Sequence, residues 1–136
     1  MATERFAQRF SDRQMLAGSR KFVAPDDDTY YIISLPRYAF VTDVWLFITK
    51  AYVGGTPSIE IGFTGNGETA AVNYFITNDI AEPTVLGLKR SVKDTLVSNS
   101  SKYFADGSGA ITLTIAAGSA TTEGNFEVFA QYYLIS

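Results

Sequence analysis

The side chains of this chain that could transfer protons near neutral pH are carboxylates, because its 136 residues include no histidine and no cysteine. Imidazole is the usual acid or base at this pH, and imidazole and thiolate are the usual ligands of zinc, copper and iron. Paired carboxylates can hydrolyse a glycosidic bond. The spacing of the candidate glutamates singles out no such pair among Glu60, Glu68, Glu82, Glu123 and Glu127. The serines have no recognisable partner base. The sequence therefore predicts no enzyme, no cofactor and no metal site.

Two other patterns could bind ions or phosphate. Asp26–Asp28 could supply oxygen ligands to calcium, but successive residues of an extended chain point in different directions and the spaced ligands of a calcium loop are missing. A solvent-exposed turn is the better interpretation. The segments Gly65–Glu68 and Gly107–Gly109 lie between predicted strands and not ahead of a helix, so they predict tight turns and not phosphate-binding loops.

The composition indicates one folded domain with large contact surfaces. Hydrophobic residues make up 46% of the chain and charged residues 18%, so a disordered chain is excluded. Aromatic residues make up 14%, and aromatic side chains are enriched in the cores of interfaces. The chain has no apolar run long enough to span a membrane and no apolar core for a secretory signal. We expect no membrane partner.

Short strand patterns separated by turn residues fill most of the chain. The apolar run Val44–Ile48 predicts a strand that is covered on both sides, and Asn78–Leu88 predicts an irregular loop. The predicted strands are Lys21–Ala24, Tyr30–Leu35, Phe40–Tyr52, Ser58–Phe63, Ala71–Thr77, Lys89–Val97, Lys102–Ala105, Ala110–Ala116 and Phe126–Ile135. Many short strands without alternating helices predict an all-β protein, an antiparallel β-sandwich or jelly roll, formed by residues 23–136.

Residues 1–22 form an N-terminal arm with its own composition. The arm has five basic and two acidic residues, a net charge of +3, which leaves −6 for the rest of the chain. Its spacing of apolar residues is typical of a short amphipathic helix, although an extended arm is also possible. We expect the arm to bind a negative surface, and nucleic acid is a weaker alternative because five spaced charges are few. The predicted arm interface is Arg5, Phe6, Arg9, Phe10 and Arg13.

The last predicted strand has two different faces. One face is apolar and predicts a core position; it consists of Phe126, Val128, Ala130, Tyr132 and Leu134. The other face mixes polar and bulky residues, and we interpret Phe129, Tyr133 and Ile135 as a subunit interface, since contiguous apolar patches usually mark contacts. An aromatic platform for a carbohydrate is the alternative for this face.

Two stretches resemble small tailed-bacteriophage virion proteins of the jelly-roll type. The first is LPRYAFVTDVWLFITKAYVGGTPSIEIG at residues 35–62, in which Val-Thr-Asp-Val leads through a Gly-Gly-Thr-Pro turn to a strand that ends in Ile-Gly. The second runs from Ala110-Ile-Thr-Leu-Thr-Ile115 through a small-residue loop to Gly124–Tyr133. Together they cover 52 of the 136 residues, and the shared motifs are turns and strands.

The resemblance implies a protein that decorates or cements a capsid. Such proteins often form trimers and reach neighbours with a terminal arm, and the family has no catalytic residues. The expected partners are copies of the chain itself, as a homotrimer, and the major capsid protein or another virion protein. The expected location is the virion, assembled in the host cytoplasm. The alternative function is a receptor- or glycan-binding module of a phage tail or head fibre.

Overall fold

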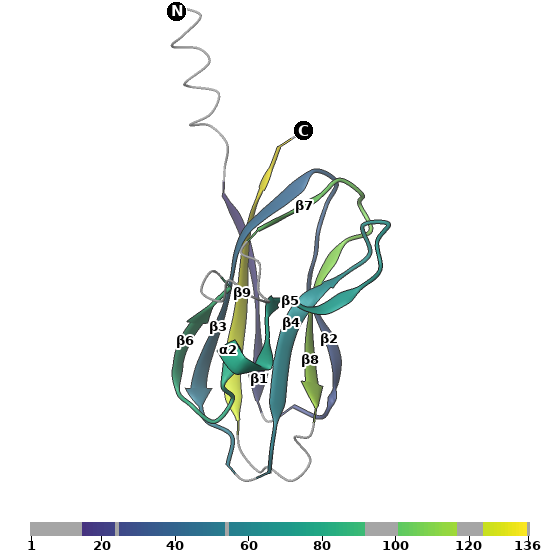
Figure 1. Ribbon diagram of the computed structural model, residues 1–136. Helices are drawn as coiled ribbons and strands as arrows, with labels where there is room; N and C mark the ends of the chain where they lie inside the picture. Colours follow the sequence, from purple (N-terminus) through teal and green to yellow (C-terminus); the bar gives the residue numbers. More distant parts are fainter. Residues whose placement is uncertain (1–14, 24, 54, 92–100, 117–123, 136) are drawn as a thin grey trace, which may run out of the picture.

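Two antiparallel sheets face each other in the computed structural model, which describes residues 15–23, 25–53, 55–91, 101–116 and 124–135 (Figure 1). The first sheet has the order β1-β9-β3-β6, and β7 also pairs with β3. Its strands are β1 (Leu16–Val23), β9 (Asn125–Leu134), β3 (Ala39–Lys50), β6 (Gly87–Arg90) and β7 (Lys102–Phe104). The second sheet has the order β2-β8-β4-β5, with β2 (Asp28–Ser34), β8 (Ala110–Ala116), β4 (Ser58–Thr64) and β5 (Ala71–Ile76).

The strand order is that of a jelly roll. The strand pairs are nested along the chain, as if one long hairpin had been rolled into two sheets. The pairs are β1 with β9, β2 with β8, β3 with β6 or β7, and β4 with β5. A short helix, α2 (Asn78–Ala81), lies between β5 and β6 in the chain. It is joined to β4 by a hydrogen bond of 2.9 Å, which the Ile59 backbone N–H donates to Asn78 Oδ1. The predicted all-β sandwich is therefore confirmed.

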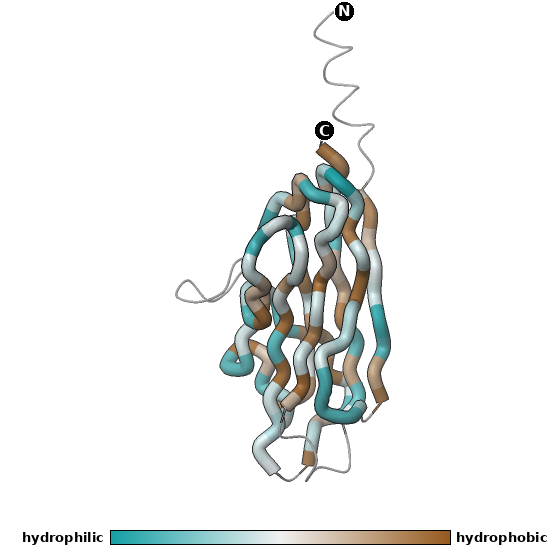
Figure 2. Tube along the Cα trace, turned by 90° about the vertical axis from the view of Figure 1, so that its right-hand side faces the viewer, coloured by the Kyte–Doolittle hydropathy of each residue, from teal (hydrophilic) through white to brown (hydrophobic). Residues whose placement is uncertain are grey.

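Alternation along the strands builds the core between the sheets. On β3 the inward residues Val44, Leu46 and Ile48 are almost completely buried, and on β8 the inward residues include Ile111 and Leu113. Figure 2 shows hydrophobic and hydrophilic residues alternating along the strands. Burying a side chain of this size contributes about 1.5–3 kcal/mol relative to an exposed position, so this layer supplies the main stabilisation of the fold.

Two strands and one loop differ from the sequence predictions. β1 starts at Leu16 and not at Lys21, because each residue from Leu16 to Val23 pairs with the long strand β9. Residues 16–22, which we assigned to the arm, therefore lie in the first sheet. β6 spans Gly87–Arg90 and so begins before the predicted Lys89–Val97, since it pairs with Trp45–Ile48 of β3. Residues 92–97 of that prediction lie outside the described residues. The predicted loop Asn78–Leu88 contains α2.

The prediction that Val44–Ile48 is covered on both sides is wrong. Val44, Leu46 and Ile48 face the second sheet, but Trp45 is half-buried and Phe47 is 41% exposed. The reason is that the sandwich has two layers, and no third layer among the described residues covers the outer side of the first sheet. An apolar run therefore marks a surface here as well as a core.

Candidate interaction surface

The outer side of the first sheet carries a continuous set of large apolar side chains. Directly paired residues of neighbouring strands point to the same side of a sheet. Phe129 pairs with Trp45, Phe47 pairs with Leu88, and Tyr133 pairs with Phe40. We call this surface the aromatic face, defined by Phe40, Trp45, Phe47, Leu88, Tyr103, Phe129 and Tyr133.

The centre of the aromatic face combines an indole ring with an ion pair. The Arg90 guanidinium lies 5.5 Å from the centroid of the Trp45 ring, and its Nη2 lies 2.6 Å from Oδ2 of Asp43. The Asp43 side chain is 14% exposed and that of Arg90 is 43% exposed. Asp43 Oδ1 and Trp45 Nε1 are buried, and neither has a hydrogen-bond partner among the described residues. Arg90 therefore covers the Trp45 ring while its charge is balanced by Asp43.

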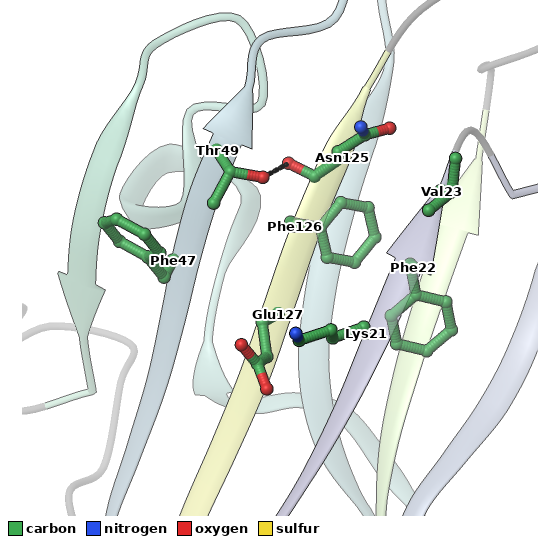
Figure 3. A pocket seen from close by; sticks show the side chains of 8 residues that line it. All are labelled: Lys21, Phe22, Val23, Phe47, Thr49, Asn125, Phe126 and Glu127. Atoms are coloured by element: carbon green, nitrogen blue, oxygen red, sulfur yellow. Dashed lines mark hydrogen bonds between the residues drawn. The ribbon is translucent and has the colours of Figure 1, made fainter.

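A shallow pocket of about 280 Å³ lies at one end of the aromatic face, where β1, β9 and β3 run side by side (Figure 3). Lys21 and Glu127 pair directly across β1 and β9, and Figure 3 shows the Lys21 ammonium turned towards the Glu127 carboxylate. Thr49 Oγ1 donates a hydrogen bond of 3.1 Å to the backbone oxygen of Asn125. The eight lining residues are Lys21, Phe22, Val23, Phe47, Thr49, Asn125, Phe126 and Glu127. The charged residues of this pocket are Lys21 and Glu127, and apolar side chains surround them. This lining suits contact with a protein better than catalysis.

The outer side of the second sheet is different in composition. Thr29 pairs with Thr114, which pairs with Glu60, and the two threonine hydroxyl oxygens lie 3.1 Å apart. Tyr31 pairs with Thr112 in the next row, and Gly62 follows on β4. We call this surface the threonine face, defined by Thr29, Tyr31, Glu60, Gly62, Thr112 and Thr114.

The far end of the sandwich is fixed by a polar network between two turns. Asn66 has a positive φ of 62°, as does Gly67 at 65°, which confirms the predicted tight turn at residues 65–68. Asn66 Oδ1 accepts a hydrogen bond from the Asp106 backbone N–H, and a Cβ at Gly65 would lie 2.2 Å from the Ser108 backbone oxygen. The two turns therefore approach so closely that only glycine fits at residue 65.

A lysine joins the two sheets beside this network. Lys102 of β7 lies 4.5 Å from the centroid of the Phe63 ring and 5.1 Å from that of Tyr74. Its Nζ lies 3.0 Å from the Glu68 carboxylate. The hydrogen bond from Lys102 lowers the pKa of Glu68 below its usual value. This arrangement tethers the sheets and presents no nucleophile.

The other residues that could bind an ion or react have structural roles. The predicted turn at Asp26–Asp28 leads into β2, and the Tyr30 hydroxyl donates a hydrogen bond of 2.7 Å to the Asp26 backbone oxygen. Burial raises the pKa of Tyr52 to about 12, so its phenol stays protonated at neutral pH. Within the part of the chain that the structure describes, no group of three or more acidic residues could hold a metal ion. None of the helices in these residues is long and apolar enough to cross a membrane.

The structure brings part of the predicted interface together. Phe129 and Tyr133 lie on the aromatic face and are half-buried, as expected of the mixed side of β9. Ile135 follows the end of β9, is 38% exposed, and donates its backbone N–H to the Tyr38 oxygen at 3.0 Å. The predicted arm interface of Arg5, Phe6, Arg9, Phe10 and Arg13 lies outside the described residues.

Sequence reasoning missed the large apolar residues that β3 and β6 add to this face. The sequence pattern predicts a strand covered on both sides for Trp45 and Phe47, and a loop for Leu88. The alternation along β3 carried the signal for these residues, because Val44, Leu46 and Ile48 alone fill the core side of the strand. The other residues of the run were therefore free to form a surface.

Comparisons with known proteins identify the fold. No protein-family model matches the sequence, and no curated protein matches it either. Among solved structures, the chain is similar to a chain in the acid-stable capsid of Helicobacter pylori bacteriophage KHP30, with a TM-score of 0.68 and 18% identity over 91% of both chains.

Two further capsid structures contain similar chains. A chain of the cyanophage Pam1 capsid asymmetric unit matches with a TM-score of 0.66 and 14% identity, over 90% of this chain and 86% of that one. A chain of the Ralstonia phage GP4 capsid matches with a TM-score of 0.61 and 14% identity, over 92% and 85%. At these identities the likeness shows a shared fold.

Proposed function

We propose that this protein is a structural component of a bacteriophage virion, a decoration or cement protein that self-associates and binds the capsid shell. The observation that carries the proposal is the likeness of nearly the whole chain to chains of three phage capsid structures. Because a fold hosts many functions, the surface matters as well. The aromatic face supports a protein that works by contact, and the chain has neither histidine nor cysteine for catalysis.

Attachment to the shell is assigned to the segment that precedes β1, whose residues 1–14 include three arginines and two acidic residues. β1 starts at the end of the first sheet where β9 ends, since Leu16 pairs with Tyr132. The segment's interface residues in this proposal are Arg5, Phe6, Arg9, Phe10 and Arg13, and its partner is an acidic surface of the major capsid protein or another virion protein. An interface of standard size buries about 1,600 Å², and a trimer would multiply the attachment through avidity. Assembly would take place in the host cytoplasm.

The alternative of a glycan-binding fibre module is less well supported. Sugar rings stack on exposed aromatic faces, but the Arg90 guanidinium already lies 5.5 Å from the centroid of Trp45. That arginine is in turn bound to Asp43 at 2.6 Å, so two of the polar groups that would surround a sugar are engaged with each other.

Deleting residues 2–14 tests the attachment. The purified full-length chain and the deletion variant are each mixed with capsids that were assembled without this protein, and the bound fraction is measured after sedimentation. We expect the full-length chain to bind and the deletion variant to lose binding while keeping its circular dichroism spectrum. The deletion must end before Leu16, because removing residues 16–21 would also remove most of β1 from β9.

A charge variant separates the basic residues from the length of the segment. Replacing Arg5, Arg9 and Arg13 by glutamine is expected to weaken binding and its dependence on salt, and the exposed loop substitution Arg37→Gln serves as the control. Binding retained by the deletion variant would contradict the assignment of the arm. Failure of the full-length chain to bind any such capsid would contradict the virion function itself.

A further inference from the structure

We propose that the aromatic face is covered by the aromatic face of a second copy of this chain. The inference rests on the self-association included in the proposed function and identifies its surface and its partner. The face contains Phe47, which is 41% exposed, and Leu88, which is 58% exposed, beside the half-buried Trp45 and Phe129. A contiguous apolar surface of this kind usually marks a protein contact.

The charges on this surface favour a second copy as the occupant. Four charged side chains flank the aromatic rows, two of each sign: Lys21, Asp43, Arg90 and Glu127. Arg90 binds Asp43 within one copy, and Lys21 pairs across the strands with Glu127. Lys50, which pairs with Asn125 at the end of β3, brings the total to three basic and two acidic side chains. Two identical faces therefore meet with little repulsion, although the chain as a whole has a net charge of −3. A strongly basic or acidic partner would find no complementary field here.

The size of the surface also fits. Four strands spaced about 4.8 Å apart and a ten-residue strand β9 give a face of about 19 by 34 Å, or about 650 Å² of projected area. Two such faces together approach about 1,300 Å², which lies within the range of specific interfaces. The aromatic rows lie near its centre on β9 and β3, where residues that dominate binding are found.

The chain's own N-terminal segment is the competing occupant. It is long enough to reach the face, since 14 extended residues span at most about 46–50 Å. However, residues 1–14 carry three arginines against two acidic residues, and Asp43, one of the two carboxylates that flank the aromatic rows, is already bound to Arg90. The segment therefore gains little electrostatic complementarity there, whereas a second aromatic face matches the apolar rows.

The test measures the mass of the full-length chain by light scattering over a hundredfold range of concentration. The face variant is Phe47→Glu with Leu88→Glu, which places acidic side chains at two exposed positions. The matched control is Tyr31→Glu with Val72→Glu, at exposed positions of 57% and 45% on the second sheet. We expect the wild type and the control to form the same oligomer and the face variant to self-associate at least about a hundredfold more weakly. Circular dichroism and urea unfolding verify that each variant is folded.

Each other outcome contradicts a distinct statement. An oligomer that the face variant leaves unchanged would overturn this inference while self-association stands. Loss of the oligomer on deleting residues 2–14, with the face variant unaffected, would identify the N-terminal segment as the contact and also overturn it. A wild-type monomer at every concentration would contradict self-association altogether, whereas the binding of capsids by the arm would remain to be judged by its own sedimentation result.

Discussion

The two outer faces of this sandwich are built on the same scaffold but carry different chemistry. The aromatic face places one aromatic residue opposite another across β9 and β3, as in the register pair Phe129 and Trp45. The threonine face has hydroxyl against hydroxyl across β2 and β8, as in the pair Thr29 and Thr114. Both sheets bury their inner sides completely at many positions. The difference therefore does not arise from the requirements of the core.

This contrast indicates which side of the molecule is adapted to contact. A threonine row suits a strand that faces water, because its branched side chains fit the sheet and its hydroxyls can bind solvent. A row of Trp, Phe and Leu side chains gains nothing from water and gains about 25 cal/mol for each Å² of apolar surface that a partner removes. The contrast supports the proposal that the first sheet meets protein. On the second sheet Thr29 and Tyr31 are exposed, whereas Thr112 is only 3% exposed.

The largest expected effect comes from neighbouring residues of β3 that point to opposite sides. Leu46→Ala removes a side chain with no exposed surface and should lower the free energy of unfolding by about 2–5 kcal/mol. Phe47→Ala lies on the aromatic face and should cost less than about 1 kcal/mol in the separate chain. Urea unfolding measures both, at a protein concentration low enough to avoid association.

A large cost for Phe47→Ala would break the contrast between the faces. If that substitution destabilised the single chain as much as Leu46→Ala, the outer side of β3 would be packed by another part of the same chain. The original expectation of a strand covered on both sides would then be correct.

A smaller effect is expected at the end of the sandwich, where Lys102 of the first sheet meets Glu68 in the turn between β4 and β5. This contact belongs to neither outer face, so it separates loss of fold from loss of surface. The pKa of Glu68 is lowered in the folded chain by its hydrogen bond from Lys102. Its stabilisation is therefore present above its usual value of 4.5 and is lost as the pH falls through the lower, folded value.

The variant Glu68→Gln makes this acid effect measurable. We expect the wild type to be more stable than Glu68→Gln at pH 7 and the difference to shrink as the pH falls below about 4.5. Urea unfolding at several pH values provides the comparison. A difference that is constant with pH would show that the Glu68 charge does not contribute to stability, in contrast to the arrangement seen here.

The elements of the fold could largely be predicted from sequence because they depend on local patterns. The alternation of Ile111, Leu113 and Ile115 identifies the inward side of β8, and all three residues are buried. The same periodicity separates the two sides of β9 and places Phe129 and Tyr133 away from the core. It fails at Leu134, a predicted core position that is 44% exposed. These features need only the two-residue period of a strand.

The missed features depend on relations between strands. Whether Trp45 and Phe47 are covered depends on the number of layers, and a single strand does not encode this number. The start of β1 at Leu16 depends on the length of its partner β9. The position of β6 likewise depends on its register with Trp45. The aromatic face therefore becomes visible only when the pairing of β9, β3 and β6 is known.

The most direct measurement of the central claim uses Trp45, which is the only tryptophan of the chain and lies on the aromatic face. Acrylamide quenching of its fluorescence is measured as the concentration rises through the range in which light scattering detects association. If this face is the contact, quenching falls as the oligomer forms, and the variant Phe47→Glu with Leu88→Glu keeps the quenching of the separate chain. Quenching that stays constant while the mass rises would contradict the claim, because the copies would then meet through another surface.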